Sequence, residues 1–296
     1  MSKTSNIMRL ALLQLKGSKD KVANVQNAVN KIEAAVKEHK PRLITLPECF
    51  NAPYGTKYFR EYSETIPDGY TSLQLSNLAK KHQVYIVGGT IPELGENDAI
   101  YNTCTVWSPT GDLVAKHRKM HLFDIDVKGG IRFKESETLS AGNDFTIIDV
   151  DGHNIGIGIC YDIRFEEMAR LYRNAGCEMI IYPAAFNMTT GPLHWELLQR
   201  SRANDNQLFV VTTSPARDTS AEYVAYGHSM VVNPWAKVQQ SASEGEETLV
   251  ADIDFSEVEQ VRQQIPVFGQ RRLDLYATEK EVQIKGLTKV ALQGHF

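Results

Sequence analysis

The sequence predicts an α/β fold, and three features of the chain point to that class. Short apolar runs typical of buried strands alternate with segments whose apolar residues recur at helical spacing. With 296 residues, 42% of them hydrophobic and 23% charged, the chain is long enough to bury a sizeable core. No linker rich in Pro, Gly or Ser and no repeat of fixed period interrupts it. We therefore predict one domain over residues 1–296, with a core from about 8 to 276.

The first hundred residues predict strands and helices in strict alternation. The apolar run MRLALLQL predicts a strand over 8–15, and the residues from Asp20 to His39 carry apolar side chains at helical spacing. Pro47 ends the next buried strand, RLITLPE, over 42–48. A helix over 71–82 and a strand over 84–91 follow. This order predicts a largely parallel or mixed sheet.

The rhythm then changes to hairpins. Strands over 100–108 and 112–119 flank the turn SPTGD, and strands over 145–150 and 153–160 flank Asp151 and Gly152. The alternation then resumes with a helix over 164–176 capped by Gly176, a strand over 178–186, a helix over 194–206, and strands over 207–216, 226–234 and 248–254. We expect the last residues, 279–296, to form an arm.

Composition argues against several functional classes. The net charge of −4 and the pI near 6.1 leave no basic stripe for nucleic acid. No apolar run reaches the roughly 18 to 20 residues of a membrane span, and the amino terminus lacks a signal-peptide core. Four scattered cysteines without a CxxC pair indicate reduced thiols. We expect a cytoplasmic protein, although the first 19 residues, basic and free of acids, leave a mitochondrial pool open.

The stretch GIGICYDIRF sets Cys160 between small or β-branched residues and a polar cluster. A free cysteine often packs as a small hydrophobe, so Cys160 could simply end a core strand. However, a buried strand would not normally run straight into Tyr161, Asp162 and Arg164. We therefore place Cys160 at a boundary between the core and a site.

Two other polar residues also close predicted strands. Glu48 closes RLITLPE and Lys119 closes DLVAKHRK, as Cys160 closes HNIGIGIC. In open α/β sheets ligands bind beyond the carboxyl ends of strands. A thiol is mostly protonated at neutral pH, so it needs a base, here Glu48, or a positive neighbour, here Lys119, before it attacks a carbonyl. The three residues together predict nucleophilic acyl transfer.

Each candidate also has a plain structural interpretation. Glu48 could pair with a nearby base, Lys119 belongs to the basic cluster KHRK that is typical of a solvated face, and Glu135 in RFKESE could be a surface acid. Rival chemistries lack a motif: the chain has no GxSxG, HExxH or phosphate-binding glycine loop. His117 and His121 have i, i+4 spacing, but the segment looks extended and lacks a third ligand, so we expect no metal.

The blocks LPECF, KHRKMHLFDID and GICYDIRF resemble the nitrilase superfamily of carbon-nitrogen hydrolases, over about residues 9–276. The resemblance implies an α-β-β-α sandwich that pairs into an αββα-αββα homodimer, with no metal or organic cofactor. It also implies a catalytic triad of Glu48, Lys119 and Cys160, with Glu135 as the second glutamate of the site. The backbone N–H of Tyr161 would join Lys119 in holding the oxyanion.

Within the superfamily, FDIDVKGGIRFKESETLSAG, AAFNMTTGPLHWELLQRSRANDNQ and YGHSMVV resemble the omega-amidase branch. That branch hydrolyses the terminal amide of 2-oxoglutaramate, 2-oxosuccinamate, succinamate and glutaramate to the dicarboxylate and ammonia, through a cysteine thioester. Its substrate-recognition residues map onto Arg164, with Tyr54, Phe186 and Thr190 shaping the pocket. An arginine fork binds a carboxylate in bidentate fashion, although Arg164 could instead brace the sheet.

Two alternatives remain. The sister branch that hydrolyses deaminated glutathione is similar in GICYD, TTGPLHWE and YGHSM, but FNMTTG and FKESETLSAG favour the omega-amidase branch. True nitrilases follow their cysteine with Trp-Glu, whereas Tyr161 and Asp162 follow here. A regulatory binding protein without catalysis would have a broken triad, and the three triad residues are all present.

Overall fold

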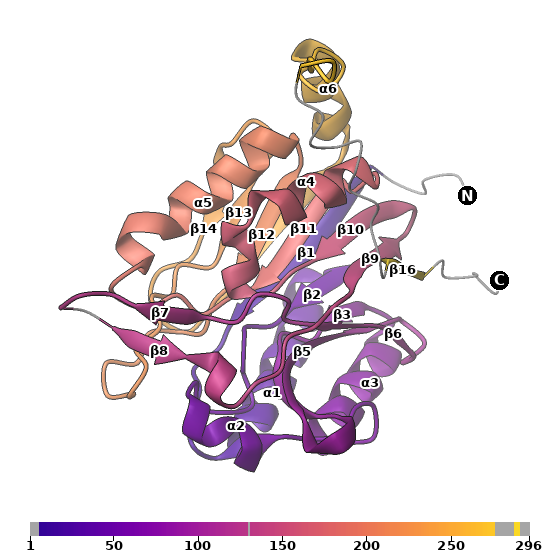
Figure 1. Ribbon diagram of the computed structural model, residues 1–296. Coiled ribbons are helices and arrows are strands. Elements are labelled where there is room, and N and C mark those ends of the chain that lie inside the picture. The colour runs from indigo at the N-terminus through magenta and orange to yellow at the C-terminus, as the bar shows by residue number, and fades with distance from the viewer. Residues whose placement is uncertain (1–5, 130, 276–286, 291–296) are drawn as a thin grey trace.

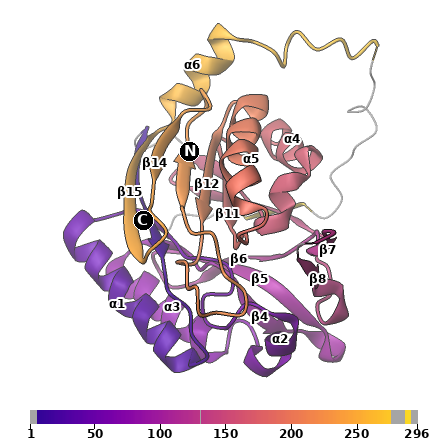
Figure 2. The same ribbon diagram turned by 90° about the vertical axis from the view of Figure 1, so that its left-hand side faces the viewer.

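The apolar side chains are buried mainly between two seven-stranded β-sheets that face each other (Figure 1). The computed structural model describes residues 6–129, 131–275 and 287–290. Helices cover the outer face of each sheet, with α1 and α3 on one side and α4 and α5 on the other (Figure 2). The predicted α-β-β-α sandwich is thus confirmed.

The first sheet contains the strands of the amino-terminal half and one strand from late in the chain. Its order is β15-β1-β2-β3-β5-β4, and β6 pairs with β5. β1 pairs parallel with β2, and β2 parallel with β3, as the strand-helix alternation predicts. The strands are β1 (Ile7–Gln14), β2 (Leu43–Thr45), β3 (Tyr85–Val87), β4 (Ile91–Leu94), β5 (Ile100–Trp107), β6 (Leu113–Arg118) and β15 (Glu247–Asp254).

The second sheet has the order β14-β13-β12-β11-β10-β9-β16. The β9–β10 hairpin turns at Asp151 and Gly152, as predicted, and β10, β11 and β12 run parallel. The strands are β9 (Phe145–Val150), β10 (His153–Ile157), β11 (Met179–Pro183), β12 (Phe209–Thr213), β13 (Met230–Val232), β14 (Val238–Ser241) and β16 (Leu287–Val290). A separate two-stranded hairpin contains β7 (Asp124–Asp126) and β8 (Arg132–Lys134).

The helices follow from amphipathic sequence and from their caps. Asp20 caps α1 by accepting the Ala23 N–H, and α1 buries Val25, Ala28 and Ile32 against the first sheet. The helices are α1 (Lys21–His39), α2 (Thr56–Tyr62), α3 (Tyr70–His82), α4 (Glu166–Asn174), α5 (Gly191–Asn206) and α6 (Ser256–Gln264). None of these described helices has the length and apolarity needed to cross a bilayer.

The core between the sheets is closely packed. Leu10 and Leu12 of β1 belong to one cluster with Ile155 and Ile157 of β10, and all four side chains are fully buried. Burial of each such side chain contributes about 1.5 to 3 kcal/mol. At the rim, Arg42 donates to both carboxylate oxygens of Asp151, at 2.6 and 2.8 Å, and so ties the start of β2 to the β9–β10 turn.

Several elements differ from the sequence prediction. The strand expected over 84–91 is two strands, because Gly88 and Gly89 break it. Gly89 has a φ of 56°, and a Cβ there would collide with the Pro47 carbonyl. The prediction missed α2, α6, β7, β8 and β14, which are short or lack clear periodicity. The arm expected over 279–296 lies outside the described residues except for β16, which pairs parallel with β9.

The buried carboxylate of Glu93 joins three strands of the first sheet, and one of its partners, Arg118, directly precedes Lys119. Glu93 of β4 accepts hydrogen bonds from Thr103 of β5 and from Lys116 and Arg118 of β6, at 2.6 to 2.8 Å. Burial raises the pKa of Glu93, but these donors outweigh it and lower the pKa to about 2. A lowered pKa means that the ion network stabilises the fold above the unfolded pKa near 4.5, and that this stabilisation is lost as pH falls towards 2.

We expect Glu93→Gln to lower the free energy of unfolding at pH 7 by about 2 kcal/mol, because it removes charged hydrogen bonds. Urea unfolding at pH 7 and pH 4 measures this effect, and the gap between variant and wild type should narrow at pH 4. Asp98→Asn is the control, because its ion pair with Arg60 is exposed and should matter by less than about 1 kcal/mol. Equal losses in the two variants would contradict the prediction.

Candidate active site

Glu48 lies in a loop that follows β2 and is held by the loop after β3. The Thr90 N–H donates to the Pro47 carbonyl, and the Thr90 hydroxyl accepts the Cys49 N–H at 2.8 Å. The Glu48 side chain is almost fully buried. Its carboxylate accepts hydrogen bonds from the Asn102 amide and from the Ala185 N–H, each at 2.8 Å. The base predicted from the sequence is therefore fixed by donors from both sheets.

Lys119 follows β6 directly, and its ammonium lies between two carboxylates. Nζ is 2.9 Å from Glu48 Oε1 and 3.0 Å from Glu135. The Lys119 N–H donates to the carbonyl of Asn102, whose side chain also binds Glu48. Both Lys119 and Glu135 are fully buried, so neither belongs to a solvated face. The structure brings together the three charged residues that the sequence singled out.

Glu135 is held by two further donors. The Tyr54 hydroxyl donates to Oε1 at 2.7 Å, and the Phe123 N–H donates to Oε2 at 2.7 Å. Tyr54 Oη also lies 3.5 Å from the Lys119 ammonium. Glu135 thus links the β7–β8 hairpin to the centre of the site.

Cys160 begins a 3₁₀ turn, η3 (Cys160–Arg164), three residues after β10 ends. Its φ of 46° is in the left-handed region, which costs a non-glycine residue of the order of 1 to 3 kcal/mol. The glycines before it admit two tyrosine rings: a Cβ at Gly156 would lie 2.8 Å from the Tyr172 ring, and one at Gly158 would overlap Tyr182. Tyr161 is in the first turn of this short helix, where N–H groups have no acceptor within the turn.

Asp162 fixes the backbone around Cys160. Its buried carboxylate accepts the Ile159 N–H at 2.8 Å, the His121 N–H at 2.9 Å and the His121 ring at 2.8 Å. Burial raises the pKa of Asp162, but hydrogen bonds from His117 and His121 outweigh it, so its pKa is well below the usual range. In the sequence, Asp162 is only a polar neighbour of Cys160, and no pattern there predicts this role.

The buried groups shift one another's protonation. Burial raises the pKa of the Cys160 thiol, the Glu48 carboxylate raises it further, and Lys119 opposes both. Burial also raises the pKa of Glu48, which is a hydrogen-bond partner of the thiol. Burial lowers the pKa of Lys119, but the carboxylates of Glu135 and Glu48 outweigh it and keep the amine charged. The resting site therefore holds a neutral thiol beside a carboxylate and an ammonium.

Of the four residues predicted to bind substrate, the structure places Tyr54, Phe186 and Arg164 beside this centre. The Arg164 guanidinium is 4.9 Å from the centroid of the Phe186 ring and interacts electrostatically with Cys160. Its Nη1 lies 3.3 Å from the His194 ring, and among the described residues it has no carboxylate partner. Thr190 is at the start of α5, and its hydroxyl donates to Asn187. The arginine is thus available to an anionic ligand.

An aromatic wall that was not predicted from the sequence lies next to Tyr54. The Tyr223 ring lies 4.4 Å from the Tyr54 ring and 5.7 Å from the Phe133 ring, centroid to centroid. The Tyr223 hydroxyl donates to the carbonyl of Ala185, whose N–H binds Glu48. Tyr223 lies in an irregular loop 63 residues after Cys160, where no periodicity signals a site. Asn102 could have been recognised from the sequence as a candidate site residue, because it is a polar amide within an apolar strand.

The expectation that all three triad residues close strands is only partly correct. Lys119 follows β6 directly, but Glu48 and Cys160 each lie three residues beyond β2 and β10. These tight loops turn the two side chains back towards the gap between the sheets. Among the described residues, no group of His, Cys, Asp and Glu could hold a metal ion.

The sandwich and the buried Glu-Lys-Cys cluster are those of a thiol hydrolase of carbon–nitrogen bonds, and the chain belongs to the carbon-nitrogen hydrolase family, whose model matches residues 9–263. The chain is 54% identical over 271 residues to omega-amidase NIT2 of Bos taurus, which covers 92% of this chain and 97% of that protein. The Homo sapiens omega-amidase NIT2 gives the same identity and coverage.

Solved structures agree with this assignment. Saccharomyces cerevisiae Nit3, a member of branch 10 of the nitrilase superfamily, superposes with a TM-score of 0.84 at 48% identity, covering 92% of this chain and all of that one. The Caenorhabditis elegans NitFhit protein superposes with a TM-score of 0.82 at 32% identity, covering 92% of this chain and 66% of that one. The fold and the amidase class predicted from the sequence are confirmed.

We expect Asp162→Asn to lower kcat by about 10- to 100-fold, because an amide nitrogen would face the N–H donors of Ile159 or His121 and displace Cys160. The measurement is kcat together with the rate at which iodoacetamide alkylates Cys160, followed by peptide mass. Asp149→Asn is the control, since Asp149 accepts one N–H in the remote β9–β10 turn. Wild-type turnover and alkylation in Asp162→Asn would contradict the positioning role.

Proposed function

We propose that this chain is an omega-amidase that hydrolyses the terminal amide of 2-oxoglutaramate, 2-oxosuccinamate and related monoamides such as succinamate and glutaramate. The observation that carries the proposal is the buried Glu48–Lys119–Cys160 cluster beside Arg164, which has no carboxylate partner within the described part of the chain. The cluster supports amide chemistry, and Arg164 supports a substrate with an anionic tail. The identity to omega-amidases over nearly the whole chain supports the same function.

In the acylation step, Glu48 takes the thiol proton while Cys160 Sγ attacks the amide carbonyl carbon. The raised pKa of the thiol favours removal of its proton by Glu48 during the attack. The Lys119 ammonium and the Tyr161 N–H stabilise the oxyanion, an effect worth about 3 to 4 kcal/mol for one donor in comparable sites. Glu48 returns the proton to the leaving nitrogen, and ammonia departs as the thioester forms.

In the deacylation step, Glu48 takes a proton from water, and the water oxygen attacks the thioester carbon. The C–S bond breaks, the sulfur recovers the proton from Glu48, and the dicarboxylate leaves. The raised pKa of Glu48 suits this role, because a base that both accepts and returns a proton works best when its pKa is near the working pH. Glu135 keeps Lys119 charged and oriented through the 3.0 Å contact.

The surroundings of Arg164 support a substrate that carries a carboxylate. The guanidinium lies against Phe186 and near the Tyr161 ring, and its Nη1 lies 3.3 Å from the His194 ring, so its other N–H groups can bind a carboxylate. We propose that the other sides of the substrate site are formed by Tyr54, Phe186 and Thr190. Deaminated glutathione is the second candidate substrate, because the sister branch shares the GICYD sequence around the nucleophile. Among the described residues, none favours this larger substrate over a monoamide. No metal or organic cofactor has a part in this scheme.

We also propose a homodimer in which two sandwiches pair. Leu193 and Leu197 of α5 support this assembly, since they are 67% and 60% exposed although apolar. A C2 contact through this helix would cover both. A cytoplasmic location, with or without a mitochondrial pool, stays a prediction from the sequence.

The test is release of ammonia from 2-oxoglutaramate, succinamate and deaminated glutathione in parallel, with Cys160→Ala as the blank. We expect turnover of the two small monoamides to exceed that of deaminated glutathione, and Cys160→Ala to be inactive while it keeps the wild-type melting temperature. Preference for deaminated glutathione would move the chain to the sister branch. More than trace activity in Cys160→Ala would overturn the nucleophile, and ammonia from none would favour a binding protein without catalysis.

We expect Arg164→Met to lower kcat/KM for succinamate by about 10- to 100-fold, because a charge-assisted hydrogen bond contributes about 1.5 to 3 kcal/mol. The loss should be mainly in KM, and butyramide, which lacks the carboxylate, should be affected little. Arg164→Lys should restore part of the loss. An equal loss for the charged and neutral amides would instead make Arg164 a brace of the sheet.

A further inference from the structure

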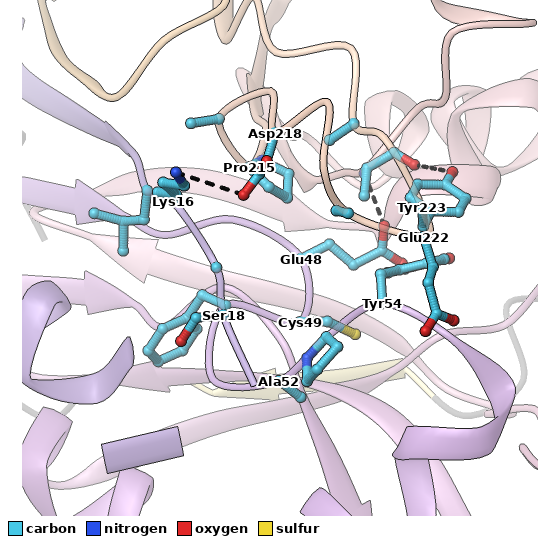
Figure 3. A pocket seen from close by; sticks show the side chains of 18 of the residues that line it. Lys16, Ser18, Glu48, Cys49, Ala52, Tyr54, Pro215, Asp218, Glu222 and Tyr223 are labelled. Carbon is cyan, nitrogen blue, oxygen red and sulfur yellow. Dashed lines mark hydrogen bonds and ion pairs between the residues drawn. The ribbon is translucent and has the colours of Figure 1, made fainter. Parts of the chain in front are cut away.

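A cavity of about 400 Å³ reaches the general base from outside the sandwich (Figure 3). The side chains of Glu48, Tyr54 and Tyr223 form its inner end. Lys16 and Asp218 face each other across its outer part, with 3.5 Å between Nζ and Oδ2. At roughly 30 Å³ per molecule, it has room for about a dozen waters.

Two of the residues proposed to hold the substrate are not among those that line this cavity. Arg164 and Cys160 interact with each other but do not line the cavity. Tyr54 and Tyr223, whose ring centroids are 4.4 Å apart, form a wall of the cavity. An acyl group on Cys160 that is held by Arg164 would therefore be bound by residues that do not line this cavity.

The acceptor capacity of Glu48 changes during the reaction. A carboxylate has about four lone-pair positions. In the resting site, N–H donors from Asn102, Lys119 and Ala185 take three, and the Cys160 thiol is the fourth partner. Once the thiol is acylated it has no proton to donate, so one position on Glu48 becomes free. A water molecule that fills this position is hydrogen-bonded to the base that must activate it.

We propose that this cavity is a water site that supplies the hydrolytic water to Glu48 in deacylation, separate from the path that the substrate takes. The inference rests on the proposed function, because it requires a thioester on Cys160. Water from the cavity gives its proton to Glu48 as its oxygen bonds to the thioester carbon. The C–S bond then breaks, and the sulfur takes the proton back, so the acid and the free thiol result.

Two variants that narrow the cavity at different depths test the proposal. Ala216→Leu adds bulk to a buried wall residue. Gly17→Phe adds a ring at the outer end, where a Cβ would have no atom within 4 Å, so folding should be little affected. The matched controls are Thr219→Leu, exposed on the same loop as Ala216, and Gly245→Phe, whose Cβ also has open space but does not line the cavity.

The readouts are the ammonia burst in rapid-quench mixing with succinamate and the mass of the acid-quenched protein. We expect both cavity variants to release the first equivalent of ammonia at the wild-type rate. Steady-state kcat should then fall at least tenfold, and the protein should accumulate with the mass of the thioester. The two controls should behave as wild type.

Other results would overturn the proposal in distinguishable ways. A slower burst or a raised KM in the cavity variants would make the cavity part of the substrate's path. Wild-type kcat and thioester level in folded Gly17→Phe and Ala216→Leu would mean that water arrives by another route. If the wild type hydrolyses succinamate while Cys160→Ala remains active, the proposed thioester mechanism itself fails, whatever the cavity variants do.

Discussion

A fully buried lysine ammonium held between two buried carboxylates is the interaction on which the rest of the site depends. Removing such ions from water costs several kcal/mol each, and only close contacts and further hydrogen bonds offset that cost. Lys119 has such contacts with Glu48 and Glu135 at 2.9 and 3.0 Å. The donors Asn102 and Tyr54 complete the shells of the two glutamates. Loss of Lys119 would leave two buried carboxylates without a cation.

The same network also explains why the thiol of the nucleophile, Cys160, is neutral in the resting site. Cys160 is surrounded by one cation and by carboxylates that oppose a second negative charge, so burial and Glu48 raise its pKa. A resting thiol is less open to oxidation than a thiolate, since the thiolate is the reactive form. The raised pKa therefore favours the protonated, less reactive form of Cys160 in the resting site.

The sequence predicted the layered α/β class, most strands and helices, and the charged cluster. These predictions rest on signals that are local: apolar runs, helical spacing around Val25 and Ile32, the Asp151–Gly152 turn, and three motifs with strong family resemblance. Features that depend on contacts distant in the chain were not predictable. Tyr223 contacts Tyr54, which is 169 residues away in the chain. Gly89, where the predicted strand breaks, must be glycine because a Cβ there would collide with the Pro47 carbonyl. Taken alone, Glu135 could be a surface acid, because RFKESE is rich in charged residues, and only the family resemblance placed it in the site, where its side chain is buried.

The division of the cluster between the two sheets has a mechanical consequence. Glu48 and Lys119 follow strands of the first sheet, whereas Cys160 follows a strand of the second, and the Arg42–Asp151 pair joins the sheets at the rim. The distance between base and nucleophile is therefore set by the thickness and alignment of the whole sandwich. Such an enzyme cannot assemble its reacting atoms by domain closure. Any motion that admits substrate must be confined to the surrounding loops, while the sandwich acts as a rigid frame for the chemistry.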